Sequence, residues 1–419
     1  MNRILGFSTA NSFSVIFRLF VSLILNKLLS IYLGPSGYAY FSQFTNAFNI
    51  GAVFSGGMYA QPASKILSDP DKQQSLEEHH SSIIRFWLIR SVLVTILMIA
   101  LLLILQQILR LDFINLDLLE YFFLFLALVM ASFNVLSLGI YSGVERFSTH
   151  IITNVTFSVI QLITIWFFIR TLGLNGAIIG FLLAIFFLFF VNIFLQWRSI
   201  KGAFKFFAEQ TLVAKQMSKL SLLAIISLTS VPLTYFIIRL IAIDQLGVES
   251  AGYWQAVWKL SDNYLLIFTS AFSMMLLPFL NKLEDFKEKL FFLRKIIFIS
   301  LSLLIPFLII IYIWSEIIIL LLFSSEFLHV INFLAFQFIG DFFKVVNIAI
   351  GILFLSNSWI KEFIIIELLS FAGFVIFSAF FIITFGEFGI GIAYVINSML
   401  IMGILFKIIH SKYYIRHIF

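Results

Sequence analysis

The chain has 419 residues, of which 61% are hydrophobic and only 11% charged, and its mean hydropathy is +1.07. Soluble domains carry about 25% charged residues, so this chain has too little charge to cover a surface that faces water. The absence of cysteine excludes disulfides, iron–sulfur clusters and thiolate catalysis. The net charge of +6 is better explained by membrane topology than by a nucleic-acid partner.

Membrane-spanning helices need about 20 mostly apolar residues, and the chain offers twelve such stretches. The first does not resemble a cleaved signal peptide, because Arg18 and Lys27 interrupt its apolar run. The predicted spans are 5–33, 38–63, 83–109, 119–141, 148–170, 174–196, 217–243, 252–280, 290–313, 330–356, 360–384 and 387–409. The polar gaps between them are too short for a separate soluble domain.

Basic residues predict the orientation of these spans. Twelve spans place both termini on one side, and alternate loops on that side hold most of the Lys and Arg residues outside the spans. The opposite side carries only Arg110 and Arg170, together with acids such as Glu316 and Glu326. By the positive-inside rule the basic side, with both termini, is cytoplasmic.

Two pairs of loop sequences indicate an internal repeat. Residues 33–38 (LGPSGY) are similar to 246–253 (LGVESAGY), and 171–176 (TLGLNG) are similar to 384–389 (TFGEFG). The interval from 33 to 246 equals that from 171 to 384, and it is close to half the chain. We therefore predict an all-α integral membrane protein with about twelve transmembrane helices in two six-helix lobes, 1–197 and 217–419, related by a parallel repeat. Such repeats commonly hold the substrate between them.

The segment 198–216 is the predicted cytoplasmic linker between the lobes. Its aromatic residues Phe204, Phe206 and Phe207 alternate with Lys201 and Lys205. This pattern is typical of a segment that lies on the inner leaflet, and an ordinary solvated linker is an equally good reading.

Charged residues within the predicted spans mark the candidate functional residues. A charge at the bilayer centre costs about 2.5–3.5 kcal/mol on insertion scales, so such groups are expected to pair or to face a wet cavity. Leaving aside the charges counted with the adjoining loops, the charged residues in the spans are Arg18, Lys27, Arg90, Arg239, Lys259, Asp262, Asp341, Lys344 and Glu367. Cations outnumber acids in this set, and a cationic site favours an anionic substrate, for which the fork of arginine suits phosphate.

Structural readings of several of these charges remain open. Lys259 with Asp262, and Asp341 with Lys344, are spaced to neutralise each other on one helix. Lys27 and Arg239 lie near helix ends, where a long side chain can reach the interface. Arg18 is central in its span and has no acid on its own helix. Glu367 is either a satisfied structural carboxyl or a group that couples transport to an ion.

Motifs for enzymes and metal sites are absent from the sequence. It contains no phosphate-binding loop of the Walker type, no His-Glu-x-x-His pattern and no Gly-x-Ser-x-Gly elbow. No cofactor or metal is expected, and an enzyme is disfavoured. The residues by themselves predict a transporter for an anionic substrate.

Motifs in the second half resemble the Wzx-type polysaccharide flippases of the multidrug/oligosaccharidyl-lipid/polysaccharide exporter superfamily. The matching segments are 252–255 (GYWQ), 261–265 (SDNYL), 271–278 (AFSMMLLP) and 337–345 (QFIGDFFKV), with Glu367 on the next helix. The first half matches mainly at Lys27 and at 34–37 (GPSG), with Arg18 where the relatives carry Lys. The chain is also unusually rich in Phe and Ile, unlike the small-residue helices of the enterobacterial common antigen branch. This difference favours an O-antigen or similar flippase over that branch.

This resemblance implies transport of an undecaprenyl-pyrophosphate-linked oligosaccharide across the bacterial inner membrane by alternating access. It implies pyrophosphate and sugar binding by Arg18, Lys27, Arg239, Gln255 and Lys259. Coupling or gating would fall to Asp262, Asp341, Lys344 and Glu367. The implied partners are the lipid-linked oligosaccharide and membrane lipids, with a polysaccharide polymerase and a chain-length regulator as candidates, and no nucleic acid. Two alternatives stay open: an ion-coupled drug exporter of the same superfamily, and a membrane O-antigen polymerase, which would need a long outer loop.

Overall fold

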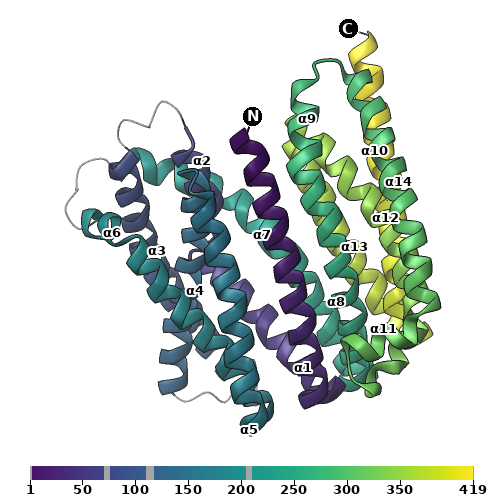
Figure 1. The fold of residues 1–419 in the computed structure, drawn as a ribbon, viewed down its shortest axis with the longest axis horizontal. Helices are drawn as coiled ribbons and strands as arrows, with labels where there is room; N and C mark the ends of the chain where they lie inside the picture. The colour runs from purple at the N-terminus through teal and green to yellow at the C-terminus, as the bar shows by residue number, and fades with distance from the viewer. Residues whose placement is uncertain (1, 70–75, 110–117, 204–209, 419) are drawn as a thin grey trace. The chain divides into compact units, whose positions relative to one another are not determined.

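The computed structural model describes residues 2–69, 76–109, 118–203 and 210–418, and these residues form helices and short turns without a strand (Figure 1). By contacts the chain divides into two compact units. The first comprises Met1–Ser22 and Phe44–Pro232, and the second Leu23–Gln43 and Leu233–Phe419. The predicted lobe boundaries at 197 and 217 stay a prediction. Arg110 and the stretch 204–209 lie outside the described residues.

The first unit is built from the long helices of the N-terminal half. Helix α4 packs against α2 and α5, and α3 packs against α6. The helices in chain order are α1 (Asn2–Phe54), η1 (Gly57–Tyr59), α2 (Ala60–Leu67), α3 (Leu76–Leu109), α4 (Leu118–Gly143), α5 (Phe147–Leu195) and α6 (Trp197–Ala203).

The second unit follows the same plan and includes part of α1. Helix α14 packs against α13 and α12, and α12 packs against α10 and α8. Its elements are α7 (Gln210–Leu246), which begins in the first unit, α8 (Val248–Ala271), the π-turn η3 (Phe272–Leu276), α9 (Leu277–Lys282), α10 (Phe286–Ile313), α11 (Ser315–Leu322), η4 (Ser325–Val330), α12 (Ile331–Ser356), α13 (Ile360–Phe385) and α14 (Phe388–Ile418).

Glycine breaks divide the two longest helices, so that each supplies two spans. The backbone of α1 leaves helical geometry at Gly34 (φ 60°) and that of α5 at Gly173 (φ 54°). The equivalent positions in the second repeat are Gly247 (φ 91°) and Gly386 (φ 59°), which lie between separate helices. Glycine occurs at all four positions because a residue with a Cβ is strained at positive φ. With α8 counted as a span, the helices match the twelve predicted stretches.

Close packing after two of these breaks follows the same repeat. A Cβ on Gly176 would lie 2.1 Å from the carbonyl oxygen of Phe168, and a Cβ on Gly389 would lie 2.2 Å from that of Phe381. The two glycines, and the two residues that they contact, are separated by the same interval as the paired loop sequences. Each half therefore uses a glycine to bring its last helix against the backbone of the preceding one, and the predicted two-fold repeat is confirmed.

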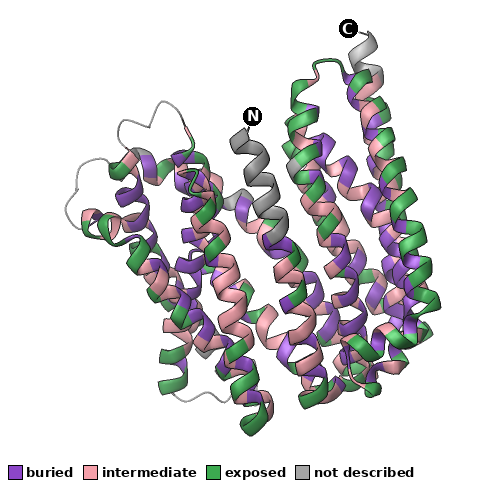
Figure 2. Cartoon of the chain, viewed as in Figure 1, coloured by how far each residue is buried: buried purple, intermediate pink, exposed green. Residues whose placement is uncertain are grey.

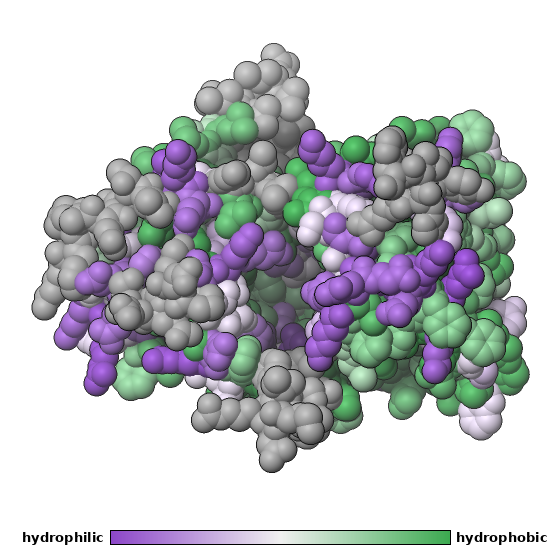
Figure 3. Space-filling model, turned by 90° about the horizontal axis from the view of Figure 1, so that it is seen from above, coloured by the Kyte–Doolittle hydropathy of each residue, from purple (hydrophilic) through white to green (hydrophobic). Residues whose placement is uncertain are grey.

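The outer faces of the helices are apolar. Figure 2 shows exposed residues along the outward sides of both units and buried residues between their helices. Side chains such as Phe194, Phe291 and Ile383 are 81%, 74% and 74% exposed. The end that includes the start of α10 and the end of α14 carries many hydrophilic side chains (Figure 3). Exposed apolar surface of this extent belongs in hydrocarbon, and the chain is a multi-pass membrane protein.

Candidate functional site

The centre of the second unit holds a fully buried carboxylate, that of Asp341 on α12. It accepts a hydrogen bond from Ser261 Oγ at 2.7 Å and one from the Tyr264 hydroxyl, both on α8. Gln337 Nε2 donates at 3.1 Å from the same helix, and the Tyr394 hydroxyl of α14 donates at 2.8 Å. Four uncharged donors from three helices thus replace the hydrogen bonds that water would make to this carboxylate.

Glycine at position 340 allows this arrangement. A Cβ there would lie 2.2 Å from Cδ1 of Tyr394. The aromatic ring therefore lies directly against the backbone of α12, which brings its hydroxyl to the carboxylate of the next residue. The motifs quoted from the sequence contain Asp341 and Gly340 as well as the donors Ser261, Tyr264 and Gln337. No motif contained the fourth donor, Tyr394.

Three of the four predicted coupling residues come together around Tyr235 of α7. This buried tyrosine interacts electrostatically with Asp262, Asp341 and Glu367, which lie on α8, α12 and α13. Asp262 is exposed, and Glu367 is half-buried. Three helices of the second unit thus carry a carboxylate within electrostatic range of Tyr235.

The lysines near these acids do not neutralise them. Among the described residues, neither Lys259 nor Lys344 forms an ion pair with the acid three residues away on its own helix. Asp341 takes its hydrogen bonds from uncharged groups instead. The two lysines are half-buried, and mutual pairing along one helix does not explain their position in the spans.

Arg239 on α7 is fully buried beside glutamines. Its Nη1 donates to Gln43 Oε1 at 2.9 Å, and its Nη2 donates to Gln255 Oε1. Its Nε has no hydrogen-bond partner among the described residues. Removing an ion from water costs several kcal/mol even after relaxation. Two neutral acceptors offset only part of this cost, so the guanidinium has unused capacity for an anion.

Arg18 on α1 is the comparable cation of the first unit. It is half-buried, and its Nε is also without a hydrogen-bond partner in the described part of the chain. It lies within electrostatic range of His150 on α5, and no described acid pairs with it. Each compact unit therefore contains a buried or half-buried arginine without a carboxylate partner in the described chain.

Lys27 on α1 contacts backbone carbonyl oxygens. Its Nζ donates to the oxygen of Leu320 at 2.5 Å and to that of Phe323 at 2.6 Å, at the C-terminal end of α11. Carbonyl groups at a helix C-terminus are unpaired and carry partial negative charge. The structure thus gives Lys27 a capping role, in addition to the pyrophosphate role that the sequence predicts.

A small cavity lies between α8, α12 and α14. Its lining includes Gln337, which donates to Asp341, and Glu387 in the loop before α14. Glu387 accepts hydrogen bonds from Ser250 and, at 2.8 Å, from His329 Nε2. Burial acts to raise the pKa of the Glu387 carboxyl, but these two hydrogen bonds outweigh it and hold the pKa below its ordinary value. The cavity therefore has an ionised group at its loop end.

A second polar network lies inside the first unit. Asn192 Nδ2 donates to Asn134 Oδ1 and the Tyr141 hydroxyl donates to Asn192 Oδ1, both at 2.9 Å. Gln196 Nε2 donates to Ser137 Oγ at 2.7 Å. These groups satisfy one another and carry no charge, so the network joins α4 to the end of α5. Among the searched residues of the chain, no group of three or more His, Asp or Glu is placed to hold a metal ion.

The helices and the repeat form a fold that solved structures of membrane transporters share. The chain matches the inward-facing conformation of a MATE family multidrug transporter of the MOP superfamily with a TM-score of 0.72 at 15% identity, covering 95% of this chain and 98% of that one. It matches the lipid II flippase MurJ, inward closed conformation, with a TM-score of 0.66 at 18% identity, covering 96% and 86%. These likenesses establish the fold alone.

Sequence comparison adds particular relatives. The chain is 28% identical over 186 residues to the lipid III flippases of Escherichia coli (strain K12) and Shigella flexneri, covering 43% of this chain. The match spans 44% of the length of these relatives. No family model matches the chain. The proteins that the chain resembles in sequence and fold are flippases and transporters, not enzymes.

Proposed function

We propose that this chain is a flippase for an undecaprenyl-pyrophosphate-linked oligosaccharide, an O-antigen repeat unit or a similar surface polysaccharide unit. It would move this substrate from the cytoplasmic to the periplasmic leaflet of the bacterial inner membrane by alternating access. The observation that carries the proposal is the pair Arg18 and Arg239, intramembrane guanidiniums without a described acidic partner in either unit. The partial identity to lipid III flippases supports the lipid-linked substrate class.

The substrate would supply the counter-charge that these cations lack. A pyrophosphate offers oxygens in the planar geometry that arginine binds through two nitrogens. Arg239 would exchange the oxygens of Gln43 and Gln255 for phosphate oxygens when the helices around it part, and the freed Gln255 would then bind sugar hydroxyls. Lys259 and Lys27 would add positive charge. The polysaccharide polymerase and the chain-length regulator would receive the product.

Coupling would use the carboxylates of the second unit. Asp341 is held by neutral donors, so a proton or monovalent cation can bind there without displacing a salt-bridge partner. Asp262 and Glu367 would share the ion around Tyr235, and Lys344 would act in gating. Gln337, which lines the cavity that also contains Glu387, would link that cavity to Asp341.

Complementation tests this function. The chain would be expressed in a bacterium whose own flippase for the cognate repeat unit is deleted, and surface polysaccharide would be resolved on a gel. Restored ladders are expected, with at least a tenfold decrease for Arg18→Gln and for Arg239→Gln at equal protein in the inner membrane. Arg170→Gln is the matched control, because Arg170 is exposed and stacks on Trp166 at 4.0 Å. Full ladders with both buried-arginine variants would refute the anion-binding role.

A drug exporter is the second candidate, and the carboxylate group around Tyr235 favours it, because acids attract cationic drugs. Expression in a strain without its main exporters discriminates the two. A flippase leaves the minimum inhibitory concentration of cationic drugs unchanged, whereas an exporter raises it and leaves the polysaccharide absent. Rescue of a polymerase-deficient strain instead of a flippase-deficient one would indicate an O-antigen polymerase.

A further inference from the structure

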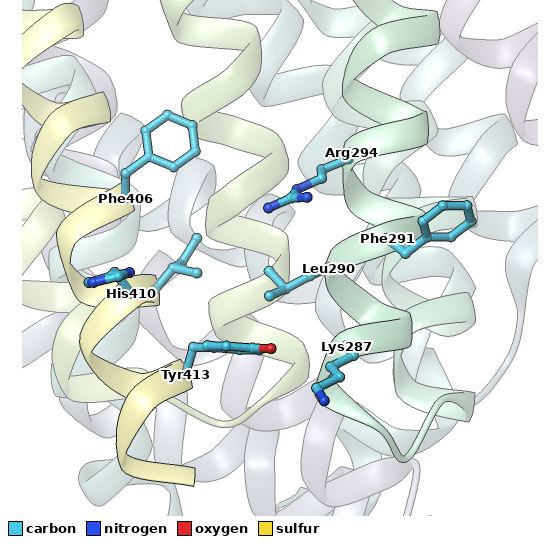
Figure 4. A pocket seen from close by; sticks show the side chains of 8 residues that line it. Lys287, Leu290, Phe291, Arg294, Phe406, His410 and Tyr413 are labelled. Carbon is cyan, nitrogen blue, oxygen red and sulfur yellow. The ribbon is translucent and has the colours of Figure 1, made fainter. Parts of the chain in front are cut away.

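A cavity at one end of the second unit lies between α10 and α14, apart from the carboxylates and arginines described above. Its volume is about 630 Å³. Arg294 extends from α10 toward α14, and the ring of Tyr413 extends from α14 toward α10, with Lys287 nearby (Figure 4). Lys287 and Tyr413 lie at the ends of the two apolar spans, Phe286–Ile313 and Phe388–Tyr413. The mouth of the cavity is therefore at the membrane interface, on the side predicted to be cytoplasmic.

The described part of the chain lines the cavity with positively charged side chains and with no negatively charged one. Lys287 and Arg294 line it, and its described lining contains no carboxylate. Glu362 is paired instead with Lys412, at 2.7 Å, and neither residue lines the cavity. Arg294 lies seven residues beyond Lys287 along α10, about 10 Å deeper along the helix axis. A guanidinium at that depth needs an anion or water as partner.

The remaining walls are apolar and aromatic side chains together with the imidazole of His410. Phe291 and Phe406 are 74% and 50% exposed, and Phe406 lies seven residues before Tyr413, about 10 Å from the mouth. A ligand with its charge at Lys287, Arg294 and Tyr413 would therefore extend an apolar part past Phe406 into the bilayer. Charge at the interface followed by hydrocarbon is the chemistry of an anionic membrane lipid.

We propose that this cavity binds the phosphate of an anionic glycerophospholipid of the inner leaflet, with its acyl chains against α10 and α14. The described lining offers no amide, carboxylate or aliphatic hydroxyl side chain that could bind several sugar hydroxyls, which argues against the oligosaccharide head of a transport substrate. Lys287 and Arg294 bind the phosphate oxygens, and the Tyr413 hydroxyl donates a further hydrogen bond. Such a lipid fixes the start of α10 against the end of α14.

Lipid titration of the purified full chain, followed by native mass spectrometry, tests this site. The probes are phosphatidylglycerol and the zwitterionic phosphatidylethanolamine. Lys287→Gln/Arg294→Gln is expected to weaken phosphatidylglycerol binding at least tenfold and Arg294→Gln alone about threefold, with little change for phosphatidylethanolamine. The matched control is Arg198→Gln/Lys282→Gln, which removes the same charge from exposed positions outside the cavity. Equal binding by the double variant and the control would overturn the proposal.

Competition experiments distinguish a glycerophospholipid from a free phosphate and from a polyprenyl pyrophosphate as the ligand of this cavity. Inorganic pyrophosphate at the same concentration is expected to leave phosphatidylglycerol bound, because it lacks acyl chains; full displacement would overturn a lipid site. A polyprenyl pyrophosphate is expected to compete no better than phosphatidylglycerol itself. Displacement at one tenth of the phosphatidylglycerol concentration would overturn the proposal in favour of the transported lipid.

Discussion

At the scale of single residues, Asp341 shows how neutral donors hold a charge within the membrane. Its two oxygens accept from Ser261, Tyr264, Gln337 and Tyr394, and none of these donors carries a charge. Ion-paired carboxylates exchange a proton or a cation only by breaking their salt bridge. A carboxylate surrounded by hydroxyl groups needs only the rotation of those hydroxyls, which can accept as well as donate. This difference makes Asp341 the best candidate for ion coupling.

Asp341→Asn separates charge from structure at this position. The NH₂ group of asparagine can donate to the two hydroxyl groups, of Ser261 and Tyr264, that donate to one oxygen of Asp341. Because most of the hydrogen bonds can thus be kept, we expect the free energy of unfolding to fall by only about 1–2 kcal/mol. Polysaccharide export should fall at least tenfold if the charge couples transport. Thermal unfolding in detergent and the complementation assay measure the two effects. Export at the wild-type level in a stable Asp341→Asn protein would show that the carboxylate has a structural role only.

At the scale of helices, the sequence predicted the spans and their repeat but few of the contacts between them. The spans follow from long apolar runs, and the breaks at Gly34 and Gly173 follow from loop sequences that recur at one fixed interval in the second half. The contact of Gln43 with Arg239 joins residues 196 positions apart, which no periodicity on one helix reveals. Tyr394 is one of 13 tyrosines in a chain with 54 phenylalanines, so nothing in the pattern distinguishes it as a ligand of Asp341.

The capping of α11 by Lys27 gives a prediction at this scale. Lys27→Met keeps the length of the side chain but removes both hydrogen bonds to the carbonyls of Leu320 and Phe323. We expect a loss of about 1–2 kcal/mol of stability, and we expect Lys27→Arg to restore most of it. Thermal unfolding of the three proteins in the same detergent measures this. If Lys27 serves only the pyrophosphate, Lys27→Met will lose export without any loss of stability.

At the scale of the whole molecule, the distribution of surface residues determines how the chain sits in the membrane. Exposed phenylalanine and isoleucine cover the outward faces of the helices, and hydrophilic side chains gather at the end shown in Figure 3. Within the second unit, the cavity between α10 and α14 lies at the end that carries the start of α10 and the end of α14. An interface rich in Lys and Arg matches the anionic lipids of the cytoplasmic leaflet, and the loop charges predict that this end faces the cytoplasm.

The natural absence of cysteine makes this orientation directly measurable. Glu316 on α11 is exposed in the connection between α10 and α12, and Lys361 is exposed at the start of α13. These positions follow the ninth and the tenth predicted span, so they lie on opposite sides of the membrane. In intact cells a membrane-impermeant maleimide is expected to label Glu316→Cys, whereas Lys361→Cys should react only after the inner membrane is permeabilised. Lys282→Cys should behave as Lys361→Cys does, because two spans separate them. The reverse pattern would place the basic loops outside and contradict the direction of transport proposed above.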